Sequence, residues 1–203
     1  MRHLRRGVVL IGVALAGLAV PVACGVELKE ESVTCPPVDV ESFRLASAVL
    51  EARCGTLDCH GNSFRALRIY GRNGLRKPVI LDEDGGVPAD SGITADQYPD
   101  YYSGSTVDTT DAELFENALA ICGLEPEKLQ AFRREAARES LPAAELAREL
   151  TFFRKARLQE RHKGGRLWNQ SDPEDKCLLE WMTATEDTLV VGDDCRTALR
   201  PRE

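Results

Sequence analysis

The chain has 203 residues, enough for one domain with a real hydrophobic core. It carries 33 acidic and 26 basic residues, a net charge of −7, and this acidic balance argues against binding to nucleic acid, whose phosphates it would repel. No dinucleotide, Walker or GxSxG motif and no nucleophile–base pair can be identified, so the sequence does not predict an enzyme with its own catalytic site.

Residues 1–23 are predicted to be a lipoprotein signal peptide. A basic leader precedes an apolar run from Gly7 to Val20 that is too short for a comfortable permanent membrane anchor. Ala23 then precedes Cys24, as at a bacterial lipoprotein cleavage site, where the cysteine thiol is lipidated. The glycine that follows favours the outer membrane, so we expect a lipid-anchored protein on its periplasmic side. The alternative is a plain secreted protein in which Cys24 is a spare thiol or a disulfide partner.

The seven cysteines are an odd number, which disulfides alone cannot use up in an oxidising compartment. Lipidation of Cys24 leaves six. Cys177 and Cys195 flank one predicted helix and are expected to form a disulfide, which would stabilise the fold by on the order of 3 kcal/mol. Cys35 pairs with Cys122 by elimination if the remaining two cysteines are otherwise used, and three bridges can form if they are not.

A single helical domain is predicted over residues 39–203, after an extended tether over residues 24–38. Its first helix runs from about Val40 to Arg53, because apolar residues recur along one face. Gly55 ends this helix. The helix therefore delivers its C-terminus directly into a cysteine-containing loop.

That loop contains two cysteines, Cys54 and Cys59, with four residues between them, and His60 follows at once. This is a wide-spaced form of the covalent haem-attachment signal, whose usual form is C-x-x-C-H. Each thiol would add across one vinyl group of the porphyrin, and the imidazole would lie under the iron as an axial ligand. A disulfide between Cys54 and Cys59, with His60 as an ordinary surface residue, is the alternative, and these residues alone favour neither.

A long surface insertion is predicted at residues 82–106, which are rich in Asp, Gly, Ser and Thr. Its acidic run, Asp82–Asp84, lacks the alternating spacing and terminal Glu of a calcium loop, so we expect a solvated turn. The segment before it, Arg65–Gly71, is short for a helix and can be extended.

Helices are predicted through the rest of the chain. Thr110-x-x-Glu113 has the pattern of a capping box and opens a helix that stops at Gly123. Pro126 is a first-turn residue of the next helix. The last helix begins at Asp172-Pro173, with Leu178, Trp181 and Met182 as its apolar side.

Between these helices a further one is predicted from about Pro142 to Arg161. Its basic residues are interleaved with acidic ones, so a salt-bridged solvent face is expected rather than a surface for nucleic acid. The residues concerned are Arg148, Arg154, Lys155, Arg157, Glu145, Glu149 and Glu160. An irregular glycine-hinged stretch at residues 161–168 follows.

These pieces together resemble the c-type cytochrome domains of exported bacterial lipoproteins. The matching residues are Cys54, Cys59-His60-Gly61, Leu67-Arg68-Ile69, His162-Lys163-Gly164-Gly165, Asp172-Pro173 and Trp181, about a quarter of the chain. The resemblance implies an all-α, cytochrome-c-like domain of several helices, disulfide-stapled and with a long irregular insertion, that carries haem c. The four-residue spacer and the lack of a Met-Pro ligand loop depart from the family.

The same resemblance implies a second axial ligand to the iron. Outside the leader, the other histidine is His162 and the methionine is Met182. His162 is preferred, because it lies in the loop before the terminal helix, where the distal ligand of these domains tends to arise. Met182 is expected to fill the core, and a five-coordinate iron is the remaining alternative. Two imidazoles would give a lower redox potential than a His/Met pair.

Two classes of function follow. One is a cell-envelope protein that carries covalent haem and passes electrons to a redox partner. The other is a haem-free, disulfide-stabilised lipoprotein that acts as a binding or scaffold module. In both, the N-terminal lipid holds the protein at the membrane, because removal of the leader leaves 23 basic and 33 acidic residues.

The signal-peptide interpretation predicts a lipid on Cys24. Growth with a radioactive fatty acid should label the wild-type protein, and Cys24→Ser should abolish the label because the acceptor thiol is gone. A wild-type protein that takes up no label would contradict this interpretation.

Overall fold

The regular structure of the described residues is helical, apart from an isolated bridge between Tyr70 and Leu75. The structure is a computed structural model, and it describes residues 35–36, 40–102, 107–139, 141–185 and 192–201, which belong to one compact unit, 33–203. The expected all-α class is therefore confirmed for this part of the chain. Within it, no helix is both long enough and apolar enough to cross a membrane. The predicted leader, Cys24 and most of the tether lie outside the described residues.

The helices are short and joined by long irregular segments. In chain order they are α2 (Val40–Arg53), η1 (Ala89–Ser91), α3 (Tyr98–Tyr101), α4 (Asp111–Cys122), α5 (Pro126–Ala136), α6 (Ala143–Leu146), η2 (Ala147–Glu149), α7 (Thr151–Ala156), α8 (Pro173–Thr183) and α9 (Asp193–Ala198).

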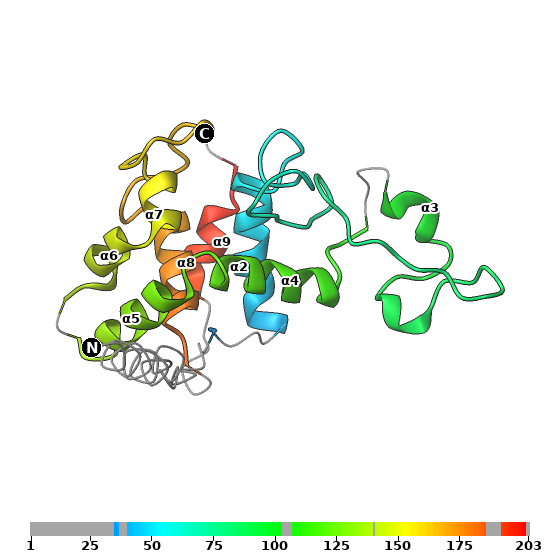
Figure 1. Cartoon of the computed structure of the whole chain (residues 1–203), viewed down its shortest axis with the longest axis horizontal. Coiled ribbons are helices and arrows are strands. Elements are labelled where there is room, and N and C mark those ends of the chain that lie inside the picture. Colours follow the sequence, from blue (N-terminus) through cyan, green and yellow to red (C-terminus); the bar gives the residue numbers. More distant parts are fainter. Residues whose placement is uncertain (1–34, 37–39, 103–106, 140, 186–191, 202–203) are drawn as a thin grey trace, which may run out of the picture. The chain divides into compact units, whose positions relative to one another are not determined.

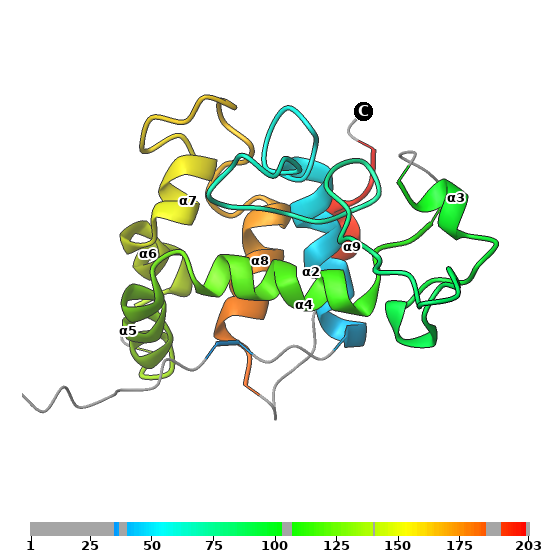
Figure 2. The same cartoon turned by 45° about the vertical axis from the view of Figure 1, so that its right-hand side comes forward.

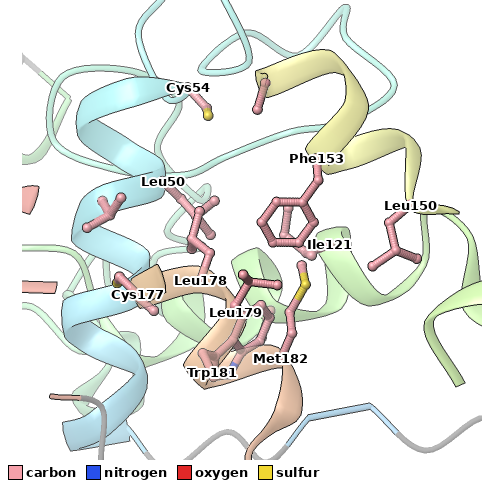
Figure 3. Close-up of a cluster of buried hydrophobic side chains, with 14 of the residues drawn as sticks. Leu50, Cys54, Ile121, Leu150, Phe153, Cys177, Leu178, Leu179, Trp181 and Met182 are labelled. Carbon is pink, nitrogen blue, oxygen red and sulfur yellow. The ribbon is translucent and has the colours of Figure 1, made fainter. Parts of the chain in front are cut away.

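The core forms where α2 packs against α4, α8 and α9 (Figure 1). Phe43 and Leu50 of α2 are fully buried, as the apolar face predicted for this helix requires. Leu178 and Met182 of α8 and Phe153 of α7 belong to the same buried cluster, as Figure 3 shows. The start of the helix at Val40 and its end at Arg53 also agree with the sequence prediction.

The predicted capping box opens α4. The Thr110 side chain accepts a hydrogen bond from the Glu113 N–H, and the Glu113 carboxylate accepts one from the Thr110 N–H at 3.0 Å. The helix then crosses α2, as Figure 2 shows, and its C-cap is Gly123. The proline-initiated helices α5 and α8 also begin where the sequence predicts.

The prediction of one helix from Pro142 to Arg161 is wrong. The chain instead forms α6, η2 and α7, with Leu150 in an extended conformation between the last two (φ −87°, ψ 123°). The Arg154 guanidinium donates to the Arg148 and Glu149 carbonyls on the far side of this break, so the backbone groups released there are satisfied. The break allows both Leu150 and Phe153 to point into the core.

The expected salt-bridged face forms only in part. Arg148 pairs with Glu145, and both Arg154 and Lys155 pair with Glu160. Arg157 is an exception that overturns the prediction of a solvent position, because its side chain is 1% exposed and forms an ion pair with Asp175 of α8. The periodicity of a straight helix gave the wrong face for this residue.

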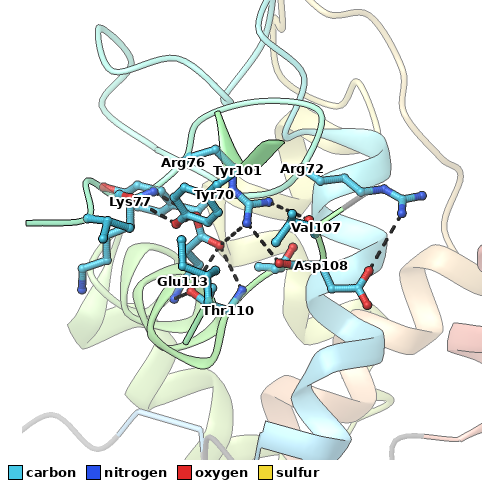
Figure 4. Close-up of polar contacts among 12 residues, drawn as sticks. Tyr70, Arg72, Arg76, Lys77, Tyr101, Val107, Asp108, Thr110 and Glu113 are labelled. Atoms are coloured by element: carbon cyan, nitrogen blue, oxygen red, sulfur yellow. Dashed lines mark hydrogen bonds and ion pairs between the residues drawn. The ribbon is translucent and has the colours of Figure 1, made fainter. Parts of the chain in front are cut away.

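Residues 77–102 are mostly irregular, contain η1 and α3, and are called the insertion below; they include the described part, 82–102, of the insertion predicted at 82–106. Ile93, Tyr101 and Val107 form a small cluster of their own. The insertion is tied to α4 through the buried Glu113, whose carboxylate accepts from the Tyr101 hydroxyl at 2.7 Å and the Lys77 N–H at 2.9 Å (Figure 4).

The same carboxylate pairs with a buried arginine. The Glu113 oxygen lies 3.2 Å from an Arg76 nitrogen, and neither side chain is more than 3% exposed. The Arg76 guanidinium also lies over the Tyr101 ring, 4.1 Å from its centroid. Burial, and then the hydrogen bond to Glu113, raise the pKa of Tyr101, whereas the neighbouring Arg76 lowers it in part.

Two disulfides connect distant parts of the chain, so the expected disulfide stapling is confirmed. They join Cys177 to Cys195, which ties α8 to α9, and Cys35 to Cys122, which ties the segment before α2 to the end of α4. These are the same pairs that the sequence suggested. The remaining described cysteines, Cys54 and Cys59, are free thiols.

Removing the charge from Glu113 should strongly destabilise the fold. Glu113→Gln leaves the buried Arg76 without its counter-ion, and breaking a buried pair in this way costs about 3–5 kcal/mol of the free energy of unfolding. The control is Glu116→Gln, because Glu116 forms an exposed pair with Lys77, and such a pair contributes about 0–1 kcal/mol. Denaturant unfolding measures both, and equal losses would contradict this account of the network.

Candidate functional site

The loop after α2 returns to the end of the helix. The Cys54 N–H donates to the Leu50 carbonyl at 2.7 Å, which completes the last helical turn. The His60 N–H then donates to the Cys54 carbonyl at 2.8 Å, so the five residues between Cys54 and His60 form a closed loop. Arg65 covers this loop and donates from Nε to the Cys59 carbonyl. The loop thus places Cys54, Cys59 and His60 together.

Three glycines allow the backbone to cross itself beneath this loop. A Cβ atom on Gly61 would lie 1.9 Å from the Gly55 carbonyl oxygen, and a Cβ on Gly74 would lie equally close to the same atom. No side chain fits at this distance. Gly61 and Gly74 are therefore required by close packing of the backbone against Gly55, a role that the sequence analysis missed.

The segment after the loop is held against α4 by a buried asparagine. Asn117 accepts from the Tyr70 N–H at 2.7 Å and donates to the Tyr70 carbonyl at 2.8 Å. The neighbouring Ile69 N–H donates to the His60 carbonyl at 2.9 Å. Both backbone groups of His60 are consequently hydrogen-bonded. The role of Asn117 cannot be read from the sequence, because a polar residue within an amphipathic helix carries no signal of its partner.

The His60 imidazole presents one free nitrogen. Its Nδ1 lies 3.0 Å from the Leu67 carbonyl oxygen, and since a carbonyl can only accept, Nδ1 carries the proton. Burial of the ring lowers the pKa of His60, partly offset by this hydrogen bond. The ring is therefore neutral at pH 7, and Nε2 has an available lone pair. Metal-ligating histidines are commonly oriented by a backbone carbonyl, which accepts a hydrogen bond from the ring nitrogen that does not bind the metal.

His162, from the loop between α7 and α8, lies beside His60. The two ring centroids are 6.3 Å apart and the ring planes are within 9° of parallel. The His162 Nδ1 lies 3.0 Å from the Gly165 carbonyl oxygen, so in the neutral ring its Nε2 is the free nitrogen as well. The structure thus brings together two histidines that are 102 positions apart in the sequence. In each of them Nδ1 faces a backbone carbonyl.

Two cavities adjoin the histidine pair, of about 380 and 610 Å³, and share part of their lining. Both volumes fall in the range of about 300–1,000 Å³ that is usual for ligand sites. The shared residues are His60, Arg65, Lys155, His162 and Leu167. The smaller cavity is mostly apolar, with Leu67, Phe152 and Ala156 in its wall. The larger one is lined by both free cysteines.

The two thiols differ in their surroundings. Cys54 is 3% exposed, and burial raises its pKa to about 12, so its sulfur is a protonated thiol at neutral pH. Cys59 is half-buried. Because both line the cavity that also holds His60 and His162, the four sequence-predicted cofactor residues share one site.

The wall of the larger cavity is basic although the chain is acidic. Its basic lining residues are Arg53, Arg65, Lys155, Arg161 and Lys163, whereas Asp58 is the acidic residue among those that line it. Some of these charges are engaged elsewhere, since Arg53 pairs with Glu174 and Lys155 pairs with Glu160. The wall nevertheless favours a ligand that carries negative charge.

Met182, the alternative axial ligand, lies elsewhere. Its side chain is 1% exposed within the core beside Trp181, and it lines neither of the two cavities at His60. Figure 3 shows it at the centre of the hydrophobic cluster, below Phe153. Within the part of the chain that the structure describes, no group of three or more His, Cys, Asp or Glu side chains could hold a bare metal ion.

Comparison with known proteins gives no match to this chain among protein-family models, curated proteins or solved structures.

The backbone crossing predicts that Gly61→Ala disrupts the site. The added methyl group would overlap the Gly55 carbonyl, and overpacking of this kind costs about 1–3 kcal/mol. Gly86→Ala is the matched control, because its nearest neighbour is the flexible Asp84 side chain at 3.2 Å. Thermal unfolding followed by circular dichroism should show a lower midpoint for Gly61→Ala only, and an unchanged midpoint would show that the crossing is not tight.

Proposed function

We propose that this chain is an exported, lipid-anchored protein of the cell envelope that binds haem c covalently and carries electrons. The single observation that carries the proposal is the pair His60 and His162, parallel and 6.3 Å apart, with each Nδ1 bonded to a carbonyl. Haem, when bound, supplies one-electron chemistry at its iron.

The two histidines would hold the iron of a haem. Their ring centroids lie 6.3 Å apart, and both side chains line both cavities. Each Nδ1 faces a backbone carbonyl, so in the neutral rings Nε2 is the nitrogen that would bind the iron. Two protein ligands would suffice, because the porphyrin would supply the others.

The free cysteines support covalent attachment. Addition of each S–H across a vinyl group forms one carbon–sulfur bond and one carbon–hydrogen bond, with no external oxidant or reductant. This chemistry needs both thiols reduced and beside His60, as Cys54 and Cys59 are. The competing disulfide between them would use the same sulfurs. With the other four described cysteines already paired, Cys54 and Cys59 are the thiols left over.

The walls of the two cavities suit the other parts of the cofactor. Leu67, Phe152 and Ala156 present an apolar surface that excludes water from a porphyrin face. The basic wall of the larger cavity, with Arg161 and Lys163, would attract the two propionate groups. An electron carrier also requires a redox partner, which we propose meets the protein on the periplasmic side of the outer membrane.

Mass spectrometry tests haem attachment. Protein produced in a host with active haem-attachment machinery should be heavier by one haem than the same lipidated, twice disulfide-bonded protein with Cys54 and Cys59 as free thiols, and its pyridine haemochrome should absorb as haem c. A mass lower by two hydrogens, with Cys54 joined to Cys59, would instead support the haem-free binding or scaffold module.

Two variants sharpen this test. His60→Ala should abolish attachment or leave an altered iron spectrum, because it removes the proximal ligand. Met182→Leu is the control: it conserves core volume, and the spectrum should be unchanged because Met182 lines neither cavity. A His60→Ala protein with the wild-type spectrum would refute the proposed ligand.

A further inference from the structure

The His162 loop begins at Arg157 and ends at Ser171, and both of its ends are attached to one buried carboxylate. Asp175, on α8, has no exposed surface. At the start of the loop, the Arg157 guanidinium donates two hydrogen bonds to it, from Nε to Oδ1 at 2.7 Å and from Nη2 to Oδ2 at 2.9 Å. Such a bidentate hydrogen bond fixes the orientation of both the guanidinium and the carboxylate.

At the other end of the loop, two more donors reach the same carboxylate. The Trp168 Nε1 donates to Oδ1 at 3.1 Å, and the Ser171 N–H donates to Oδ2 at 2.9 Å. Ser171 has a positive φ of 71°, which is uncommon for a side-chain-bearing residue, so the hydrogen bond holds an otherwise disfavoured turn. Four hydrogen bonds to Asp175 thus close the loop at its base.

Between these anchors the loop has further contacts. Glu160 pairs with Arg154 and Lys155, and the Leu167 N–H donates to the Ala156 carbonyl at 2.9 Å. Arg161 is attached through its carbonyl, which accepts from Lys155 Nζ at 3.2 Å, and His162 through its hydrogen bond to Gly165. Leu158, with a φ of 56°, turns the chain out of α7, and Gly165 has a φ of 73°. These contacts and the hydrogen bonds at the base together set the position of the imidazole, and Asp175 supplies the part that joins the two ends of the loop. The base of the loop is also anchored by a disulfide, because the bond between Cys177 and Cys195 ties α8, which carries Asp175, to α9.

We propose that Asp175 is a positioning residue for the iron site. It closes the loop between Arg157, Trp168 and Ser171, and this closure keeps His162 at 6.3 Å from His60 as the second axial ligand. This inference rests on the proposed function for its spectroscopic consequence, but the closure of the loop is a property of the chain alone.

The first experiment uses the haem-loaded protein. Asp175→Asn keeps the shape of the side chain but places N–H groups against those of Arg157. The protein should retain covalent haem through Cys54 and Cys59, while the iron changes from six-coordinate low-spin to a spectrum with a high-spin component, as in His162→Ala. Added imidazole should restore the low-spin spectrum in both variants, because it supplies the missing ligand.

Glu113→Gln is the matched control, because it also breaks a buried ion pair but lies on α4, at the base of the insertion. It should lose stability and keep the wild-type spectrum. Trp168→Phe removes a single hydrogen bond from Asp175 and should give a smaller change in the direction of Asp175→Asn. A wild-type spectrum in Asp175→Asn, or the same high-spin change in Glu113→Gln, would overturn the inference.

The second experiment needs no haem. In full-length protein with Cys54→Ala and Cys59→Ala, trypsin can cut the loop at Arg161 and Lys163. Adding Asp175→Asn should speed this cleavage by about tenfold or more, because losing charge-assisted hydrogen bonds favours local opening. Adding Glu113→Gln instead should leave the cleavage rate within about twofold of the rate for the protein that carries only the two cysteine substitutions, since the base of the loop is intact. Equal rates with and without Asp175→Asn would overturn the inference, whereas a wild-type protein without haem would overturn only the proposed function.

Discussion

Buried carboxylates on helices hold the irregular half of this protein in place. Glu113 of α4 accepts hydrogen bonds from the Thr110, Lys77 and Tyr101 segments, and Asp175 of α8 accepts from both ends of the His162 loop. Long irregular segments leave backbone N–H groups without the partners that helices or sheets would supply. An ionised carboxylate has room for about four such donors, so one side chain can organise a whole segment.

Each carboxylate also binds a buried arginine, Arg76 in one case and Arg157 in the other. Taking two charges out of water is costly, and well-packed apolar side chains would often be as stable. An apolar pair would not, however, fix the direction of the chain, because dispersion contacts tolerate many orientations while hydrogen bonds do not. In this protein the ion pairs specify where the irregular segments leave and rejoin the helices. The Glu113 pair does so for the insertion, and the Asp175 pair does so for the loop that carries His162.

Sequence patterns identified the parts of the fold that local rules control. The capping box at Thr110, the proline at position 126 and the apolar face of α2 are short-range signals, and the helices they predict begin where expected. The cysteine–histidine spacing predicted a site at Cys54, Cys59 and His60, and His162 was preferred over Met182 as their partner because of its loop before the last helix. The structure places all four around one cavity.

The features that were missed depend on contacts between distant segments. Leu150 breaks a predicted helix because Arg154 and the core together favour the break, and the same misjudged periodicity put the buried Arg157 on a solvent face. In the sequence Gly61 cannot be distinguished from any other loop glycine. Only the fold shows that its backbone packs directly against Gly55. Asn117 and Asp175 are each a polar residue in a helix, and nothing within a few positions of them indicates what they bind.

The two histidines are held by different physical means, and this difference bears on how the site works. His60 is fixed by its own backbone bonds, by the crossing at Gly55 and by a helix that ends at its loop. His162 is carried by a loop whose two ends are both hydrogen-bonded to Asp175. The position of His162 therefore depends on the side chains of Asp175 and Arg157, whereas that of His60 depends largely on backbone groups of its own loop. A substitution at the base of the His162 loop can consequently displace this imidazole while the His60 loop stays intact, so the two sides of the site can be tested separately.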